Sequence, residues 1–180
     1  KNFGANVGES IISTQPFADI SDFVARVPNK NLNKKSLESL IQSGALDELG
    51  ERGQLLANIE KLLEAHREFT KAPVGQSSLF GGLAETPMTK LKLDDAPPAS
   101  MDVRLIWEKE LLGLYISGHP LDKHKDKLAN QKTTIKHAKE HLQGVETVIA
   151  GYIENIQYIL TKKGEKMAFL KLSDFSGDCE

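Results

Sequence analysis

His137 and His141 have the spacing in this chain that most resembles a metal site. With Glu140 they match the pattern H-x-x-E-H, in which two histidines one helical turn apart can hold a zinc ion. Short motifs of this kind often arise by chance, and the candidate third ligands, Glu146 and Glu154, lie on a predicted strand. We therefore predict that the two histidines belong to a solvated helix face and that the chain has no metal site.

Acidic residues do not indicate a catalytic centre either. Asp94 and Asp95 are adjacent, but they lie among prolines with no predicted strand to hold them, which favours a solvated linker. The sequence contains no phosphate-binding loop, nucleophile elbow or dinucleotide fingerprint. We expect no catalytic residue and no cofactor within this chain.

A basic stretch near the N-terminus is a stronger signal, and it indicates binding. No acidic residue occurs between positions 26 and 37, and Gly44 then separates two predicted helices, as Gly4 does earlier. Helix-Gly-helix turns can present backbone N–H groups and a helix N-terminus to a phosphate, and lysines attract DNA whatever its sequence. An ordinary helical hairpin with a solvated basic loop explains the pattern equally well. The candidate DNA-binding residues here are Gly4, Arg26, Lys30, Lys34, Lys35 and Gly44.

A second basic cluster lies near the C-terminus, with Lys162 and Lys163 at the tip of a predicted β-hairpin and Lys166 at the start of its second strand. In small barrels of the OB type, the corresponding loop and strands bind oligonucleotides, and Phe169 offers a ring on which a base can stack. The alternative is a charged hairpin tip that prevents edge-to-edge pairing of strands.

One short segment stands out inside a stretch rich in glycine and proline. Its residues are Gln76, Ser77, Ser78, Leu79 and Phe80. Leu79 and Phe80 can fill a hydrophobic pocket, which is worth roughly 3–6 kcal/mol before ordering costs, while Gln76 fixes the register. Taken as five residues alone, the segment is explained as well by packing of the loop onto its own domain.

The elements expected to position these residues are helices first and strands afterwards, which predicts an α+β fold. Apolar residues repeat every three to four positions through residue 70, with Ser21, Asn33 and Asp47 as expected helix caps and Gly44 as a left-handed helix end. After Gly144 the period changes from 3.6 to 2. We expect a helical region at 1–70, a loop at 71–99, a helical connector at 100–143 with helices at 102–116 and 134–141, and the first strands of an OB-type barrel at 144–180, namely 145–160 and 167–172.

Composition excludes several classes of protein. The chain has 180 residues, 39% apolar residues and a formal charge of -2, from 23 basic and 25 acidic side chains. These values exclude wholesale disorder and collagen, and no apolar run approaches the roughly 20 residues of a membrane span. A single cysteine, Cys179, excludes an internal disulfide and favours a reducing compartment, here the cytoplasm. The chain opens inside a patterned segment, so we interpret it as part of a longer protein.

Five stretches, in order and spacing, resemble the C-terminal part of bacterial DNA polymerase III alpha subunits. They are residues 1–4, 33–47, 75–81, 108–121 and 161–174, and the most characteristic is Gly118-His119-Pro120-Leu121. The resemblance implies a tandem helix-hairpin-helix region at 1–70 that grips duplex DNA, a sliding-clamp motif at 76–80, and an OB domain from about 144 near single-stranded template. Other replicase subunits would be partners, and the polymerase carboxylates with their Mg²⁺ would lie upstream. In one departure from the family, Asn2 stands where a glycine is common and the first hairpin lacks its leading helix.

Two other classes remain open from the residues themselves. An OB-fold protein that binds tRNA or other RNA explains residues 161–174, and a helical interaction scaffold explains residues 1–70. Neither explains the segment 76–80 together with 118–121.

Overall fold

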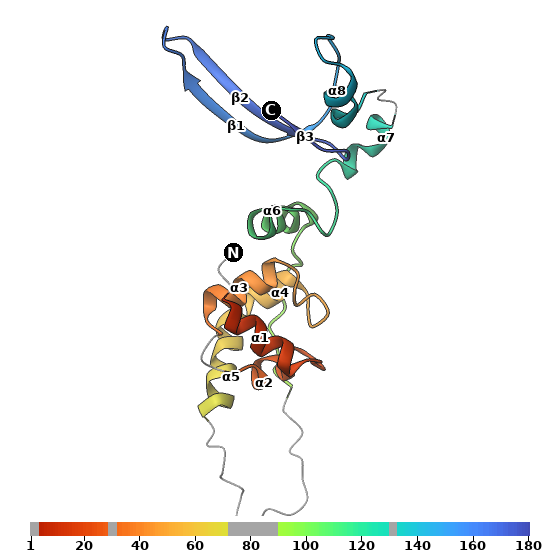
Figure 1. Cartoon of the computed structure of the whole chain (residues 1–180). Helices are drawn as coiled ribbons and strands as arrows, with labels where there is room; N and C mark the ends of the chain where they lie inside the picture. Colours follow the sequence, from red (N-terminus) through yellow and green to blue (C-terminus); the bar gives the residue numbers. More distant parts are fainter. Residues whose placement is uncertain (1–3, 29–31, 72–89, 130–132) are drawn as a thin grey trace, which may run out of the picture. The chain divides into compact units, whose positions relative to one another are not determined.

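The computed structural model describes residues 4–28, 32–71, 90–129 and 133–180 (Figure 1). The chain folds as two compact units, Lys1–Ile116 and Ser117–Glu180. The first unit is helical and the second combines short helices with a small antiparallel sheet. This confirms the α+β prediction. The predicted boundaries at residues 70, 99 and 143 stay predictions. None of the described helices has the length and apolarity needed to cross a membrane.

The first two helices are α1 (Ala5–Thr14) and α2 (Ile20–Arg26). The prediction that Ser21 caps α2 is wrong: the side chain of Asp19 accepts the hydrogen bond from the N–H of Asp22 at 3.0 Å. Ser21 is buried, and its hydroxyl accepts a hydrogen bond from the N–H of Leu91 at 2.9 Å. Asp is as good a cap as Ser, so local chemistry did not distinguish these two positions.

Helix α3 (Lys34–Gln42) begins and ends as the sequence predicts. Asn33 caps it in a reciprocal capping box with Ser36, and Gly44 follows it with φ +84°. The N–H of Gly44 bonds to the carbonyl of Ile41 and the N–H of Ala45 to that of Leu40. These two bonds form a complete Schellman motif, which requires the left-handed residue that glycine supplies.

The next helix begins later than predicted. Glu51, not Asp47, caps α4 (Arg52–Ala57), and Asn58 separates it from α5 (Ile59–Lys71). The apolar repeat from Leu55 to Phe69 therefore runs over two helices instead of one. The periodicity of apolar residues alone does not reveal this break, because the apolar face continues from one helix into the next.

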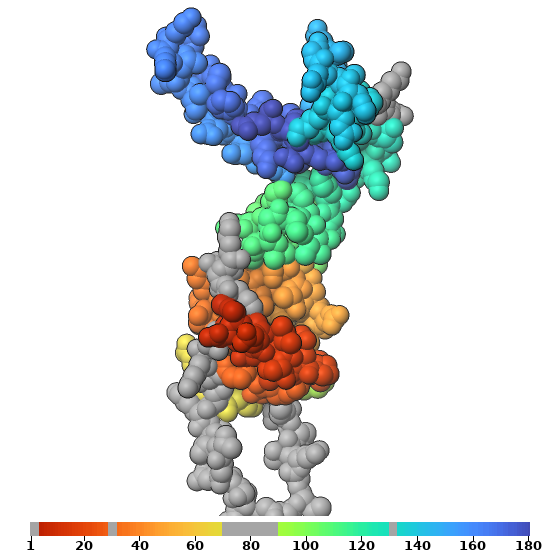
Figure 2. All heavy atoms as spheres, viewed as in Figure 1, coloured from red at the N-terminus to blue at the C-terminus, as the bar shows by residue number. Residues whose placement is uncertain are grey.

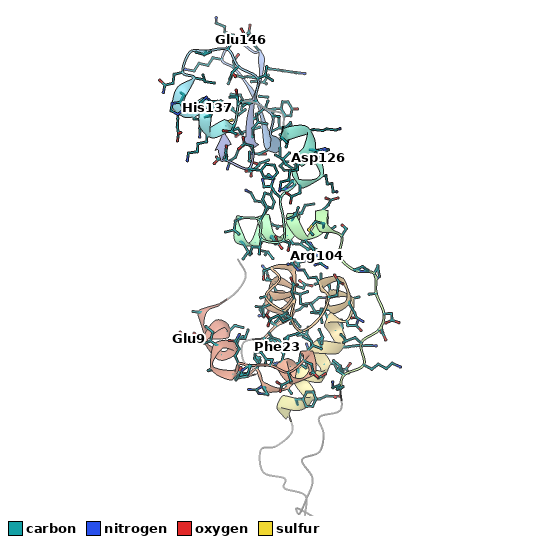
Figure 3. The ribbon with its side chains drawn as sticks, turned by 90° about the vertical axis from the view of Figure 1, so that its right-hand side faces the viewer. Glu9, Phe23, Arg104, Asp126, His137 and Glu146 are labelled. Atoms are coloured by element: carbon teal, nitrogen blue, oxygen red, sulfur yellow. The ribbon has the colours of Figure 1, made fainter. Side chains whose placement is uncertain are left out.

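The core of the first unit lies where these helices meet. Figure 3 shows Phe23 in the interior, among these helices. In the space-filling view, α1 (red) lies directly against the helices coloured orange, as parts of one surface (Figure 2). Seven side chains in this core have no exposed surface: Phe23, Val24, Val27, Leu37, Ile41, Leu55 and Leu62.

Residues 90–99 return along this helical body as an extended segment. The side-chain amide of Asn58 donates to the carbonyl of Asp94 at 2.9 Å and its oxygen accepts from the N–H of Asp94 at 2.8 Å. Leu91 and Leu93 pack against the core.

Ser100 then caps α6 (Met101–Leu112), which ends at Gly113 with φ +82° and not, as predicted, near Gly118. A left-handed glycine nearer than Gly118 ends the helix first.

The second unit contains η1 (Asp122–His124), α7 (Lys125–Leu128) and α8 (Ile135–His141), followed by the sheet. Strands β1 (Tyr152–Leu160), β2 (Lys166–Ser173) and β3 (Asp178–Cys179) pair antiparallel in the order β1-β2-β3. The predicted strand at 145–160 is too long at its start, since residues 145–151 are not in a strand. Beyond the two predicted strands, the chain forms the short strand β3. The sheet is small and open, so an OB barrel is not confirmed.

Asp174 joins the end of β2 to the start of α8. Its carboxylate accepts hydrogen bonds from the N–H groups of Ile135 at 2.8 Å, Ser176 at 2.7 Å and Gly177 at 3.0 Å. Burial raises the pKa of Asp174, but these bonds, with that from the Ser176 hydroxyl, outweigh it and hold the pKa below its ordinary value. The ionised carboxylate therefore stabilises this unit.

We expect Gly44→Ala to cost more stability than Gly113→Ala. Both glycines have φ above +80°, which costs an alanine about 1–2 kcal/mol. A Cβ at Gly44 would also overlap the guanidinium of Arg52, whereas a Cβ at Gly113 has no atom within 4 Å. Urea unfolding of the two variants measures the difference, and equal losses would show that Arg52 moves away freely.

The stability of the second unit should fall at acid pH through Asp174. Because its pKa is lowered in the folded state, its contribution is complete above the unfolded value of about 3.9 and is lost as the pH falls through that value to the folded pKa. Asp174→Asn should remove about 1 kcal/mol at neutral pH and flatten this acid limb. Unfolding curves between pH 3 and 7 test this, with Asp178→Asn as the exposed control.

Candidate nucleic-acid interface

Lys34 and Lys35 occupy the first turn of α3. The ammonium of Lys34 lies 2.6 Å from the carboxylate of Glu60, and this hydrogen bond raises the pKa of Lys34 and lowers that of Glu60. Both side chains are more than half exposed, so water and salt screen the pair. Lys35 is exposed and forms no ion pair with any residue that the structure describes.

The place of these lysines on the helix is informative. The N-terminal turn of a helix carries partial positive charge, so two cations there oppose the helix dipole. Helix stability alone does not favour them, but an anion bound at this end would be attracted by the lysines and by the dipole together. This turn therefore has the electrostatics of a phosphate site.

Arg26 has a structural role that the sequence did not reveal. Its guanidinium donates to the carbonyl of Pro16 at 2.8 Å, to the carbonyl of Thr14, and to the carboxylate of Asp22 at 2.8 Å. It thus holds the end of α1 against α2. Residues 26–37 contain no acidic residue, but two of their cations contact carboxylates from elsewhere in the chain: Arg26 pairs with Asp22 and Lys34 with Glu60. Lys30 lies outside the described residues.

The turn at Gly44 presents fewer amides than a helix-Gly-helix pattern suggests. The N–H groups of Gly44 and Ala45 close the end of α3. The N–H of Leu46 forms no backbone hydrogen bond within the described part of the chain, and Leu46 is itself buried. Gly4, the other predicted hairpin glycine, is exposed, caps α1 with φ -86°, and has open space around its Cβ position.

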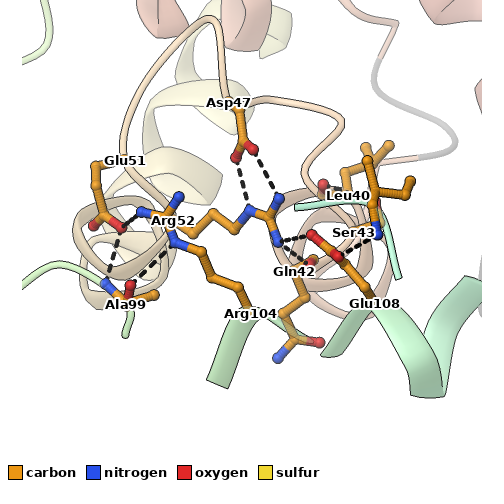
Figure 4. Close-up of polar contacts among 10 residues, drawn as sticks. Leu40, Gln42, Ser43, Asp47, Glu51, Arg52, Ala99, Arg104 and Glu108 are labelled. Carbon is orange, nitrogen blue, oxygen red and sulfur yellow. Dashed lines mark hydrogen bonds and ion pairs between the residues drawn. The ribbon is translucent and has the colours of Figure 1, made fainter. Parts of the chain in front are cut away.

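Arg52 lies beneath the turn and fixes its shape (Figure 4). It is buried, and its Nε and Nη2 donate to the two carboxylate oxygens of Asp47, both at 2.8 Å. Its Nη1 donates to the carbonyl of Gln42 at 3.2 Å and to Oε1 of Glu108 at 2.9 Å. The hydrogen bonds with Asp47 and Glu108 raise the pKa of Arg52 against the effect of burial. Sequence reasoning missed this cluster, because Arg52 and Glu108 lie 56 residues apart.

The second basic cluster lies on the β1-β2 hairpin. Lys162 and Lys163 are exposed in the turn that Gly164 closes with φ +78°, and Lys166 begins β2. Phe169 is 40% exposed and pairs in register with Gln157. The structure thus brings the four predicted residues Lys162, Lys163, Lys166 and Phe169 onto one hairpin.

The hairpin has two different faces. Because side chains alternate along a strand, Phe169 shares a mixed face with the polar Gln157 and Lys171 and the apolar Ile159 and Met167. The opposite face is mainly apolar and largely uncovered, with Lys166 at the end next to the turn, and sequence reasoning missed it. Its residues are Ile153, Ile156, Tyr158, Leu160, Leu170 and Leu172.

The segment Gln76–Phe80 lies outside the described residues, so its predicted role stays a prediction. His137 (labelled in Figure 3) and His141 lie on α8, and their ring centroids are 4.9 Å apart. Within the described ranges, no three His, Cys, Asp or Glu residues group closely enough to hold a metal ion. The prediction that the chain binds no metal remains untested.

Comparison with known proteins identifies the class first. The helix-hairpin-helix motif family matches residues 1–55, which include α3 and the turn at Gly44. The first part of the N-terminal unit is therefore a helix-hairpin-helix motif.

The longer alignments identify the particular family. The chain is 39% identical over 167 residues to the DNA polymerase III subunit alpha of Bacillus subtilis, which covers 92% of the chain. It is 34% identical over 188 residues to that of Thermus aquaticus, covering all of the chain, and 39% identical over 176 residues to that of Deinococcus radiodurans, covering 91%. The chain spans 13–15% of the length of these relatives. It belongs to the DNA polymerase III alpha subunit family, as a segment.

Proposed function

We propose that this chain is the DNA- and clamp-binding segment of a bacterial replicative DNA polymerase and supports processive, template-directed synthesis. The observation that carries the proposal is its similarity, over nine-tenths of its length or more, to DNA polymerase III alpha subunits. The polymerase carboxylates and their Mg²⁺ ions belong to other parts of such a protein, where further replicase subunits also assemble. This segment holds DNA and the clamp.

Duplex DNA is held by phosphate contacts at the N-terminal unit. Lys34 and Lys35 supply the charge at the first turn of α3, the backbone at the Gly44 turn supplies an N–H donor, and Arg26 and Lys30 lie nearby in sequence. The exposed pair of Lys34 with Glu60 exchanges readily for a phosphate because solvent already screens it. Contacts to phosphate alone do not distinguish base sequences.

Replacing Lys34 and Lys35 together by alanine should weaken duplex binding and its dependence on salt. Each phosphate contact contributes about -0.9 to the slope of log affinity against log salt, so the slope should become shallower by about 1.8. Fluorescence anisotropy with a mixed-sequence duplex over a salt series measures both quantities. Unchanged affinity and slope would place the duplex site elsewhere.

Lys162→Ala with Lys163→Ala is the matched control, because it removes the same charge from the other unit. We propose that this hairpin, with Lys166 at the start of β2 and the ring of Phe169 on the face of Gln157 and Lys171, contacts single-stranded template. We propose further that the apolar face is the inner side of an OB barrel. The control variant should keep its duplex affinity and lose affinity for single-stranded DNA, with a slope change of about 0.7 per contact.

The clamp contact is made by Gln76, Ser77, Ser78, Leu79 and Phe80. Leu79 and Phe80 enter a hydrophobic pocket on a ring-shaped clamp, and Gln76 fixes the register. A short peptide loses conformational entropy on binding, so this contact alone has about micromolar affinity, near 8 kcal/mol. Processivity then follows from tethering, because the polymerase already holds the DNA that threads the ring.

Leu79→Ala with Phe80→Ala should abolish clamp binding, because it removes both side chains that fill the pocket. Duplex binding by the N-terminal unit should not change, which serves as the control for folding. Calorimetric titration of the clamp measures the first effect and anisotropy the second. Clamp affinity that survives the double substitution would mean that Leu79 and Phe80 pack against their own domain.

A further inference from the structure

Glu108 is a buried carboxylate that comes from α6, far in sequence from the helix-hairpin-helix turn. Its side chain has no exposed surface, yet one of its oxygens contacts the guanidinium beneath that turn (Figure 4). We infer that Glu108 is a positioning residue that shapes the Gly44 turn for phosphate contact, acting through Arg52. The inference rests on the proposed function, in which this turn lies against duplex DNA.

Arg52 binds the turn from both of its sides. The carbonyl of Gln42 belongs to the last residue of α3, and Asp47 follows the left-handed Gly44. One rigid, planar guanidinium therefore fixes the distance between the two ends of residues 42–47. Its close approach to Gly44, where a Cβ would overlap it, leaves the turn no room to collapse inward.

Glu108 determines where this guanidinium lies. Oε1 of Glu108 accepts from Nη1 of Arg52 at 2.9 Å, and Oε2 accepts from the N–H of Ile116 at 2.7 Å. With both oxygens engaged, the carboxylate has one orientation and directs Nη1 toward the 3.2 Å bond with Gln42. A neutral amide in its place can accept from only one of these two donors.

A second ion pair between α6 and α4 provides a matched comparison. Nη2 of Arg104 lies 2.8 Å from Oε1 of Glu51, and its Nε donates to the carbonyl of Ala99 at 3.0 Å. Like Glu108, Arg104 thus ties α6 to the helical body, but its partners lie outside residues 42–47. A general loss of α6 docking would affect both variants, whereas loss of the shaped turn affects only the Glu108 variant.

The test uses the 180-residue chain, a mixed-sequence duplex and the variants Glu108→Gln and Arg104→Met. We expect Glu108→Gln to lower duplex affinity about tenfold and to make the salt slope shallower by about 1, the effect of one lost phosphate contact. Arg104→Met should keep the wild-type affinity and slope. Partial unfolding would lower the fraction of chains that bind and leave the slope unchanged. Faster amide exchange at Gly44 and Ala45 in Glu108→Gln should accompany the loss.

Several results would overturn the inference. Wild-type affinity and slope in Glu108→Gln would show that the turn does not need Glu108, and equal losses in both variants would show that α6 docking is responsible. If the wild-type chain does not bind duplex, or Lys34→Ala with Lys35→Ala has no effect, the proposed function fails first and the inference with it.

A second variant covers the case in which Glu108→Gln does not fold. Arg52→Met with Glu108→Leu removes the buried pair as a whole, and such replacements are often neutral or stabilising because no buried charge is left alone. We expect this variant to fold and to bind duplex with the same shallower slope. Wild-type binding by it would overturn the inference.

Discussion

The burial of the Arg52 guanidinium is the constraint on which the helical unit depends. A cation with 2% of its side chain exposed is stable only if its donors are satisfied, and the structure satisfies them with Asp47, Gln42 and Glu108. These partners come from the turn, the end of α3 and α6. The requirement therefore explains why Gly44 must be a glycine, why Asp47 serves as a partner and not as a cap, and why α6 belongs with the helices before it.

Features that depend on neighbouring residues could be predicted from the sequence. Asn33 begins helix α3 and Gly44 follows its end as expected, because capping involves atoms within four or five positions. The turn 161–164 and its two strands follow for the same reason. Where two good caps compete, as with Asp19 and Ser21, the deciding factor is tertiary: Ser21 is buried against Leu91, 70 residues away.

For the candidate DNA-binding site, the basic stretch at residues 26–37 shows what the local sequence could not predict. Its charges were counted correctly, but Glu60, the partner of Lys34, lies 26 residues away and has no signature in the local sequence. The same holds for Glu108, which lies 56 residues from its partner Arg52. A count of charges also cannot distinguish Arg26, which ties two helices together through backbone carbonyls, from Lys35, which is exposed. The apolar face of the β-hairpin was missed for a similar reason. Which residues of β1 and β2 share a face is known only once the pairing register of the two strands is known.

The extended segment 90–99 has a consequence for how the chain would respond to a protease. It is joined to α4 and α5 through Asn58, Glu51 and Lys61, and it places Leu91 and Leu93 on the core. A cut anywhere between residues 72 and 89 would break the backbone without separating the pieces. The contacts of residues 90–99 with α4 and α5 join one piece to the other and do not depend on the backbone between them. The nicked chain would migrate as two fragments on a denaturing gel and as one particle in solution. Separately produced halves would be expected to reassociate into the same helical body.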